Sequence, residues 1–150
     1  MSWQQYQKPD QATLQATLDP LVYKVTQEAG TERAGSSVLN TEKRPGLYVD
    51  VLSGEPLFLS SDKYESKTGW PSFVRPVSDT AVLTHEDRTL FFQTRTEVRS
   101  AIADSHLGHV FTDGPTERGG LRYCMNGAAL RFIPQDELVA AGYGEYLERL

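Results

Sequence analysis

The chain has 150 residues, of which 39% are hydrophobic and 23% charged, and it carries a net charge of −5 at pH 7. This composition is that of a globular protein and excludes a disordered or coiled-coil chain. The acidic balance opposes the basic surface that nucleic-acid binding requires. No apolar run approaches the ~18 residues of a membrane span, and the amino terminus lacks the pattern of a secretory signal. We therefore expect one domain over residues 1–150, a cytoplasmic monomer that binds neither nucleic acid nor membrane.

A helical region is predicted over about 10–30, and its first helix occupies 10–18. Asp10 is placed to cap this helix, and Leu14 and Leu18 fall four residues apart on one face. We assign packing, and no chemistry, to this region.

The second predicted helix begins at Asp19-Pro20, because proline after an aspartate cap suits the first helical position. It is expected to end at Gly30. Its inward-facing positions are predicted to be Leu21, Val22 and Val25. The polar stretch over 31–46 is rich in glycine, serine and proline and predicts an exposed loop.

From about 46 to 134 the sequence changes to short apolar runs that are β-branched or aromatic and separated by turn residues. Eight strands are predicted, at 47–52, 55–59, 81–84, 89–94, 96–99, 109–111, 121–124 and 129–133. Short strands without long helices between them favour antiparallel sheets. A short helix over 134–141, ended by Gly142, and a tail complete the chain.

Cys124 is the only cysteine, so the chain can form no internal disulfide and no cysteine-pair zinc site. It lies in an alternating segment in which Arg122 shares its face. An arginine that folds toward the sulfur favours the thiolate, the reactive form of cysteine. Two interpretations stay open at this point, a nucleophile and a buried structural thiol.

Two of the three histidines, His106 and His109, lie three residues apart and close to the cysteine in sequence. Each is a candidate metal ligand, general acid or packed core residue. The third, His85, stands with Glu86 and Asp87 in a stretch that predicts a solvated polar loop. The chain offers no ligand set typical of zinc.

Trp70 lies between a glycine and a proline, and the residue before proline is held extended. It is either a rigid aromatic face for a small methyl group or a cation, or a plug of the core. Asn126 lies two residues after the cysteine, where its amide is placed to hold a water or a histidine. Four further charged residues are predicted to form structural or surface ion pairs, namely Arg95, Arg99, Asp104 and Asp113.

Four blocks of the sequence together resemble one known family, the type B methionine sulfoxide reductases, which reduce the R-epimer of methionine sulfoxide. The blocks are Gly69-Trp-Pro-Ser-Phe73, Arg95-Thr-Glu-Val-Arg-Ser100, Asp104-Ser-His-Leu-Gly-His-Val-Phe111 with Asp113-Gly-Pro115, and Gly120-Leu-Arg-Tyr-Cys-Met-Asn126 with Leu130-Arg-Phe-Ile-Pro134. The resemblance runs from about 23 to 134. It implies a mainly β fold of two antiparallel, tent-like sheets, with helices at the amino end and a short carboxyl-terminal helix, in a single reductase domain over 1–150.

Carried over position by position, the resemblance implies catalytic roles for Cys124, His106, His109 and Asn126, and substrate-binding roles for Trp70 and Arg122. The tryptophan matches the residue that receives the methyl group of the substrate. The arginine matches one beside the nucleophile. His85 aligns loosely with a further histidine of the family.

Two departures from the family pattern shape the expected chemistry. Many members bind a structural zinc through two Cys-x-x-Cys pairs, and the corresponding positions here are Asp50, Ser53, Ser100 and Ala103. A resolving cysteine common before the Gly-Trp-Pro-Ser-Phe block is Thr68 here. The resemblance therefore implies a zinc-free enzyme without a cofactor. Its oxidised cysteine would need an external thiol, from thioredoxin or from glutaredoxin with glutathione.

The substrate implied by the resemblance is methionine sulfoxide, free or in oxidised proteins. Two other hypotheses remain. One is a non-catalytic β module whose aromatic pocket binds a small ligand, with an inert cysteine. The other is a thiol peroxidase, which also passes through a sulfenic acid.

Overall fold

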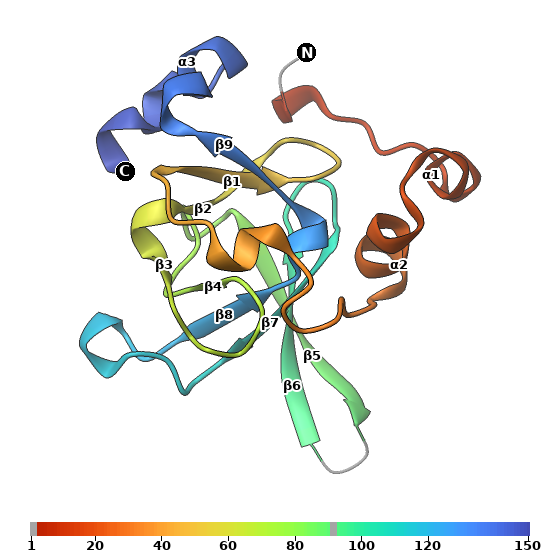
Figure 1. Ribbon diagram of the computed structural model, residues 1–150. Helices are drawn as coiled ribbons and strands as arrows, with labels where there is room; N and C mark the ends of the chain where they lie inside the picture. Colours follow the sequence, from red (N-terminus) through yellow and green to blue (C-terminus); the bar gives the residue numbers. More distant parts are fainter. Residues whose placement is uncertain (1–2, 91–92) are drawn as a thin grey trace.

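The computed structural model describes residues 3–90 and 93–150, and this part of the chain forms two antiparallel sheets (Figure 1). The three-stranded sheet has the order β2-β1-β9, and the six-stranded sheet the order β3-β4-β8-β7-β6-β5. The strands are β1 (Gly46–Asp50), β2 (Pro56–Leu59), β3 (Lys63–Tyr64), β4 (Ser72–Phe73), β5 (Val82–Leu90), β6 (Gln93–Ser100), β7 (His106–Phe111), β8 (Arg122–Met125) and β9 (Leu130–Pro134). The predicted fold class is confirmed.

Helices lie at both ends of the chain. The α-helices are α1 (Gln11–Thr17), α2 (Pro20–Glu28) and α3 (Leu138–Ala141). Single turns of 3₁₀ helix are η1 (Trp3–Gln5), η2 (Val38–Thr41), η3 (Ser60–Asp62), η4 (Thr116–Arg118), η5 (Gly127–Ala129) and η6 (Gln135–Glu137), and η7 (Gly144–Arg149) is a longer one. Among the residues described, no helix has the length and apolar character needed to cross a membrane.

The two amino-terminal helices begin at the predicted caps. The Asp10 carboxylate accepts a hydrogen bond from the backbone N–H of Thr13 at 2.8 Å, and Asp19 caps α2 in the same way. The inward face of α2 differs from the prediction, because Leu21 is 43% exposed while Val25 and Thr26 are buried. The hydroxyl of Thr26 donates to a backbone carbonyl one turn earlier, so this polar residue is buried with its hydrogen bond satisfied.

Three further segments differ from their predicted ends or exposure. Helix α2 ends one residue early, with Ala29 in the left-handed conformation at φ 54°. In the predicted exposed loop, Glu32 is only 2% exposed. The predicted tail contains η7, and Tyr143 before it is buried, with its hydroxyl donating to the carbonyl oxygen of Gly54 at 2.6 Å. Hydrogen-bond partners far away in sequence account for the last two differences.

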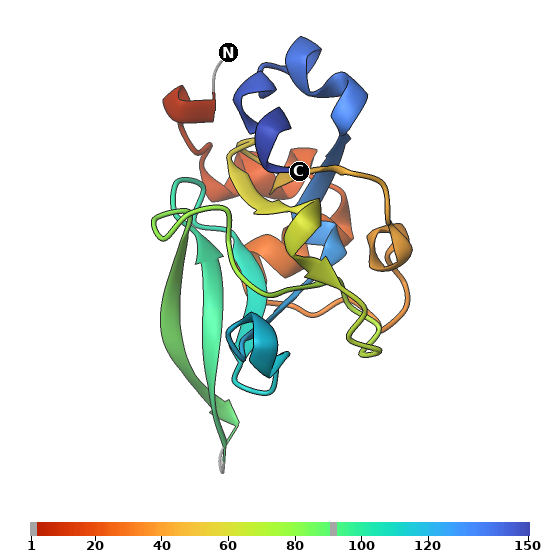
Figure 2. The same cartoon turned by 90° about the vertical axis from the view of Figure 1, so that its left-hand side faces the viewer.

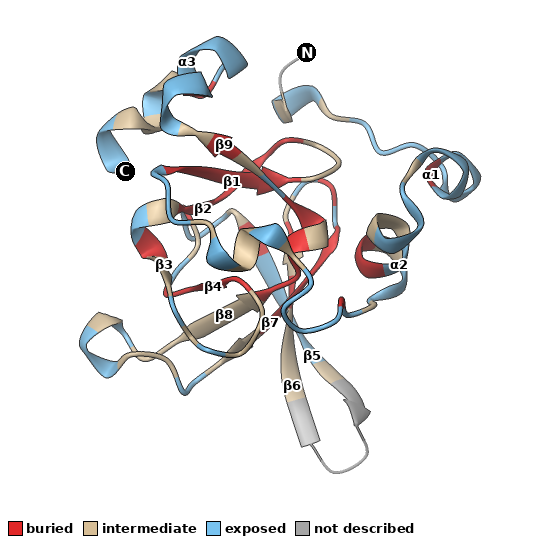
Figure 3. Ribbon diagram, in the orientation of Figure 1, coloured by how far each residue is buried: buried red, intermediate tan, exposed pale blue. Residues whose placement is uncertain are grey.

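Strand β1 lies at the centre of the packing and is buried along its whole length (Figure 3). Tyr48 belongs to a core cluster with Phe58 and Phe73, whose rings stack at a centroid distance of 4.4 Å. Its neighbours Leu47 and Val49 point to the other face and pack in a second cluster with the carboxyl-terminal helix. The alternation of side chains on β1 thus joins the two halves of the core.

Strands β5 and β6 form a long hairpin that extends away from the body of the protein (Figure 2). The predicted strand over 89–94 is wrong in its boundaries, because its first residues belong to β5 and its last to β6, with Leu90 paired to Gln93. Positions 91–92 of that prediction lie outside the described residues. His85 is exposed, as predicted, but it lies within β5 and not in a loop. Strands β3 and β4, of two residues each, were not predicted.

Candidate active site

Cys124 lies on β8, where its Cα is paired with Ser72 of β4 on one side and with His109 of β7 on the other. The Thr68 hydroxyl lies 4.0 Å from the Cys124 sulfur. Burial raises the pKa of the Cys124 thiol, and this effect outweighs the opposing effects of Thr68, Arg122 and Ser72. Arg122 therefore favours the thiolate, as its position in the sequence predicted, but does not by itself overcome burial.

Arg122 is fixed beside the thiol by two contacts with its neighbours. Its guanidinium donates to both carboxylate oxygens of Asp113, at 2.8 and 3.1 Å. It also lies over the ring of Phe111, at 4.3 Å from the ring centroid. The charge that acts on the sulfur is thus held on a restrained side chain.

A β-bulge explains how two histidines three residues apart lie on one face of a strand. Val98 pairs with Gly108, but the next residue of β6 pairs with His106, so Leu107 is the extra residue of β7. The rings of His106 and His109 consequently lie next to each other, with centroids 5.5 Å apart in an edge-on arrangement. The displaced Leu107 is fully buried in the core.

Each histidine is paired with a carboxylate that also binds an arginine. Glu97 lies 2.6 Å from Nδ1 of His106 and 2.8 Å from the guanidinium of Arg99. His106 is 1% exposed, and burial lowers its pKa although Glu97 opposes this. A neutral His106 that donates from Nδ1 has an unprotonated Nε2, which is buried and lacks a hydrogen-bond partner among the described residues.

The second pair repeats this arrangement closer to the thiol. Asp87 of β5 lies 2.9 Å from Nε2 of His109 and 3.2 Å from the guanidinium of Arg95. The three residues come from neighbouring strands, since Asp87 is paired across the hairpin with Arg95 and His109 lies on the next strand. The carboxylate fixes both the orientation of the imidazole and its tautomer, with Nε2 as donor.

A cavity of about 100 Å³ brings several of these side chains together. It is lined by Thr31, Trp70, Arg95, Gly108, His109, Phe111, Cys124, Met125 and Asn126. Pockets for drug-sized ligands measure ~300–1,000 Å³, so this one suits the end of a side chain. His106 and Arg122, both predicted as site residues, are outside the set that lines it.

Trp70 and Asn126 are fixed by hydrogen bonds to backbone groups. The indole N–H of Trp70 donates to the carbonyl oxygen of Glu32 at 3.0 Å. The Asn126 amide donates to the carbonyl oxygen of Leu107 at 3.0 Å, and its oxygen accepts the backbone N–H of Glu32 at 2.8 Å. Asn126 therefore fixes the backbone of Leu107, the bulged residue of β7, close to both histidines.

The four positions where the resemblance places zinc ligands in other proteins do not fit a zinc ion. Asp50 accepts the N–H groups of Leu52 and Ser53 through one oxygen, and Ala103 has no side-chain donor atom. The Ser100 hydroxyl accepts a backbone N–H within its own turn. A structural zinc site needs four sulfur, nitrogen or carboxylate ligands. In residues 3–90 and 93–150, no group of three or more histidine, cysteine or acidic residues is arranged to hold a metal.

The buried carboxylate of Glu55 links the two turns at which these four positions lie. Glu55 is 2% exposed, and its oxygens accept the backbone N–H groups of Ile102 and Ala103 at 2.9 and 2.8 Å. It also accepts the hydroxyl of Ser53 at 2.8 Å. Burial raises the pKa of Glu55, and the nearby charge of Asp50 adds to this increase. The turn after β1 is thereby joined to the turn after β6.

Comparison with known proteins identifies the class to which this fold and cavity belong. The chain belongs to the SelR domain family, which matches residues 18–134. It is 58% identical over 142 residues to a protein of Vibrio cholerae serotype O1 named peptide methionine sulfoxide reductase MsrA/MsrB. The similarity covers 95% of this chain but 37% of that protein. The chain thus spans a little over a third of its relative, and the resemblance to the type B reductases is confirmed.

Several residues around the cavity were not recognised from the sequence. Arg95 forms an ion pair, as predicted, with Asp87, but it also lines the cavity, which its position in the sequence did not indicate. Asp87 and Glu97 were not connected with the histidines, and Glu32 was placed in an exposed loop. One signal was available, since Arg95, Glu97 and Arg99 alternate along a strand and must share a face.

Proposed function

We propose that this chain reduces methionine R-sulfoxide to methionine, with Cys124 as the nucleophile. The observation that carries the proposal is the small cavity in which the only cysteine, a carboxylate-paired histidine and an indole meet. Membership of the SelR domain family, and the similarity to a protein named peptide methionine sulfoxide reductase, support this substrate class. We treat the chain as a single domain, because Ala81 packs against both core clusters.

His109 is the proton donor in this proposal. Its Nε2–H is directed to Asp87, which leaves Nδ1 to exchange a proton with the sulfoxide oxygen. A protonated sulfoxide oxygen makes the sulfur a better electrophile. His106 acts through its neighbour and not on the substrate, because it does not line the cavity. Its lowered pKa keeps it neutral, so it does not repel a positive charge on His109.

The remaining site residues bind and orient. Trp70 forms a wall against which the methyl group of the sulfoxide packs, and Asn126 positions the bulged strand that carries the histidines. Arg122 stabilises the thiolate of Cys124 against the effect of burial. When the sulfoxide group enters the cavity, its oxygen meets the proton donor His109 and its sulfur meets the nucleophile Cys124.

The reaction balances with one thiol and one sulfoxide. The Cys124 thiolate bonds to the substrate sulfur while His109 gives a proton to the sulfoxide oxygen. The oxygen then passes from the substrate sulfur to the Cys124 sulfur, the transient sulfur–sulfur bond breaks, and methionine leaves. The sulfenic acid on Cys124 keeps the proton from His109, which replaces the one that the thiol lost on forming the thiolate. Two external thiols then reduce Cys124, forming one disulfide and one water. Thr68 cannot take part in this step, although its hydroxyl is the group at 4.0 Å from the sulfur. Thioredoxin or glutaredoxin with glutathione is chemically adequate.

A single-turnover experiment tests the proposal. Reduced protein mixed with one equivalent of methionine R-sulfoxide should release one methionine and gain the mass of one oxygen, while the S-epimer and Cys124→Ser should release none. Hydrogen peroxide, run in parallel as oxidant, should oxidise the thiol more slowly than the R-sulfoxide. Faster reaction with peroxide would favour a thiol peroxidase, and release no faster than with free cysteine would favour a binding module.

A further inference from the structure

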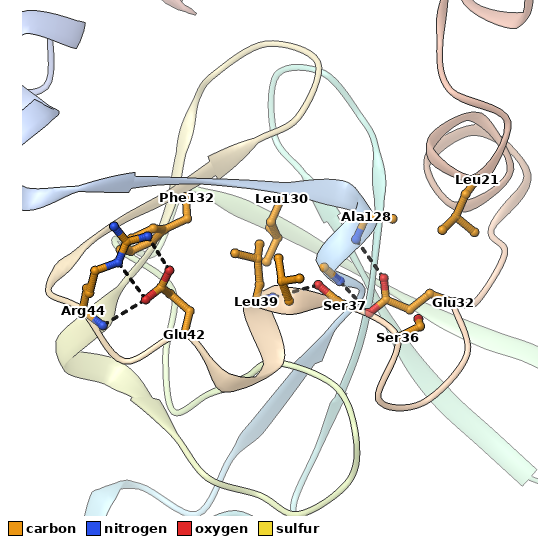
Figure 4. A pocket seen from close by; sticks show the side chains of 12 residues that line it. Leu21, Glu32, Ser36, Ser37, Leu39, Glu42, Arg44, Ala128, Leu130 and Phe132 are labelled. Atoms are coloured by element: carbon orange, nitrogen blue, oxygen red, sulfur yellow. Dashed lines mark hydrogen bonds and ion pairs between the residues drawn. The ribbon is translucent and has the colours of Figure 1, made fainter.

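The buried carboxylate of Glu32 holds the turn that follows the strand of the cysteine. Its two oxygens accept the backbone N–H groups of Gly127 and Ala128 in η5, at 2.9 and 2.8 Å. Figure 4 shows the Glu32 side chain pointing toward Ala128 in a groove that also contains the Glu42–Arg44 ion pair. The glutamate is 2% exposed, so water competes little for these bonds.

Gly127 fits this arrangement because it has no side chain. A Cβ at this position would collide with the Ser37 hydroxyl oxygen and lie 3.5 Å from the Glu32 carboxylate. Close approach of the loop to the η5 turn therefore depends on the glycine.

The backbone of Glu32 reaches two residues of the cavity. Its N–H donates to the Asn126 amide oxygen, and its carbonyl oxygen accepts the Trp70 indole N–H. Trp70 and Asn126 come from segments more than 50 residues apart, and both line the cavity. The same residue thus binds the aromatic wall, the asparagine and the turn beside the asparagine.

We propose that Glu32 is a positioning residue of the active site, an inference that rests on the function proposed above. The carboxylate fixes the Glu32 peptide on the η5 turn, and the peptide in turn fixes the indole of Trp70 and the amide of Asn126. Without the carboxylate, the Glu32 peptide is no longer attached to the η5 turn. The carbonyl oxygen that accepts the Trp70 indole N–H is then no longer held in place. The thiol itself is not bonded to Glu32, so its own reactivity stays unchanged.

The experiment compares Glu32→Ala with Glu55→Ala. Both remove a carboxylate that is 2% exposed and accepts two consecutive backbone N–H groups, but only the first lies beside the cavity. In Glu32→Ala, the KM for methionine R-sulfoxide with dithiothreitol as reductant should rise roughly tenfold or more, since small misplacements at a site cost one to two orders of magnitude. The rate of Cys124 alkylation by iodoacetamide should stay at the wild-type value. Glu55→Ala should leave KM unchanged.

Trp70 fluorescence gives a second measurement that does not depend on activity. In a Trp3→Phe background Trp70 is the only tryptophan, and its emission should shift in Glu32→Ala and not in Glu55→Ala. Glu32→Gln keeps one acceptor oxygen and should recover part of both effects. The inference is overturned if KM and emission stay at wild-type values in Glu32→Ala. If the wild type reduces no sulfoxide, the proposed function fails, and the emission alone decides the role of Glu32.

Discussion

Glu32 and Glu55 use the same hydrogen-bonding arrangement in two parts of the molecule. Each is 2% exposed and each accepts the N–H groups of two consecutive residues in a turn distant in sequence. A buried carboxylate is costly unless its oxygens are bonded, and two backbone donors offset much of that cost. The arrangement itself therefore does not distinguish a functional position from a structural one.

What differs is the surroundings of the turn that each carboxylate holds. The turn that Glu32 holds directly follows Asn126. The backbone of Glu32 is hydrogen-bonded to Asn126 and to Trp70, and both of these residues line the cavity. The turn that Glu55 holds lies away from the cavity, and its hydrogen bonds connect the turn after β1 to the turn after β6. We expect loss of the first to change catalysis more than folding, and loss of the second to do the reverse.

The largest expected effect comes from a third carboxylate, Asp87, which contacts the histidine of the cavity directly. Asp87→Asn should slow methionine release in a single turnover by about 10²-fold, at the low end of the ~10²–10⁴-fold range for general acid catalysis. The amide keeps the size of the side chain but no longer stabilises a protonated His109. Rapid-quench measurement of released methionine checks this.

Asp104→Asn is the matched control for this substitution. Asp104 also pairs with an arginine, Arg99, but its side chain is 59% exposed and it does not contact a histidine. Equal slowing in both variants would contradict the role of Asp87 in orienting His109. An unchanged rate in both would remove His109 as the proton donor.

The second prediction concerns the stability of the fold. Glu55→Ala leaves the buried N–H group of Ala103 and the partly buried N–H group of Ile102 without their acceptor, at up to ~1–3 kcal/mol each, while relief of a buried charge offsets part of this. We expect a net loss of about 2–4 kcal/mol in the free energy of unfolding, measured by urea denaturation. An unfolding free energy equal to that of the wild type would show that the hydrogen bonds of Glu55 do not stabilise the fold.

Much of the fold was predictable from local patterns, and the exceptions have a common cause. Caps such as Asp10 and Asp19, and the apolar alternation of β1, depend on neighbours within a few residues. Glu32 and Tyr143 were wrongly placed because their partners lie more than 80 residues away in sequence. A single sequence contains no signal for such pairs.

The candidate site was predicted in part for the same reason. The predicted strand over 109–111 contained His109 but not His106, and a β-bulge at Leu107 brings the two rings together. A bulge depends on the register of two strands, which the residues of one strand do not determine. The family resemblance supplied the candidate site residues that the pattern alone did not.

The third prediction tests the charge beside the thiol. Arg122→Met keeps the aliphatic stem but removes the positive charge, which opposes the rise in pKa that burial causes at Cys124. The pKa of Cys124 should therefore rise further, and alkylation by iodoacetamide at neutral pH should slow several-fold. The pH at half-maximal alkylation rate measures the shift. Arg131→Met, at an exposed position of β9, is the control. A midpoint that does not move in Arg122→Met would contradict the role of the arginine.

The smallest expected effect is the pH dependence of the contribution of Glu55 to stability. Burial raises the pKa of Glu55 above 4.5, so the folded state binds its proton more tightly than the unfolded state does. The contribution of Glu55 to stability is then complete below about pH 4.5 and is lost as the pH rises through the raised pKa. Relative to Glu55→Gln, which does not titrate, the wild type should become less stable over this interval. Urea midpoints between pH 4.5 and 7 measure the difference, and parallel curves for the two proteins would mean that the Glu55 carboxylate keeps its ordinary pKa in the fold.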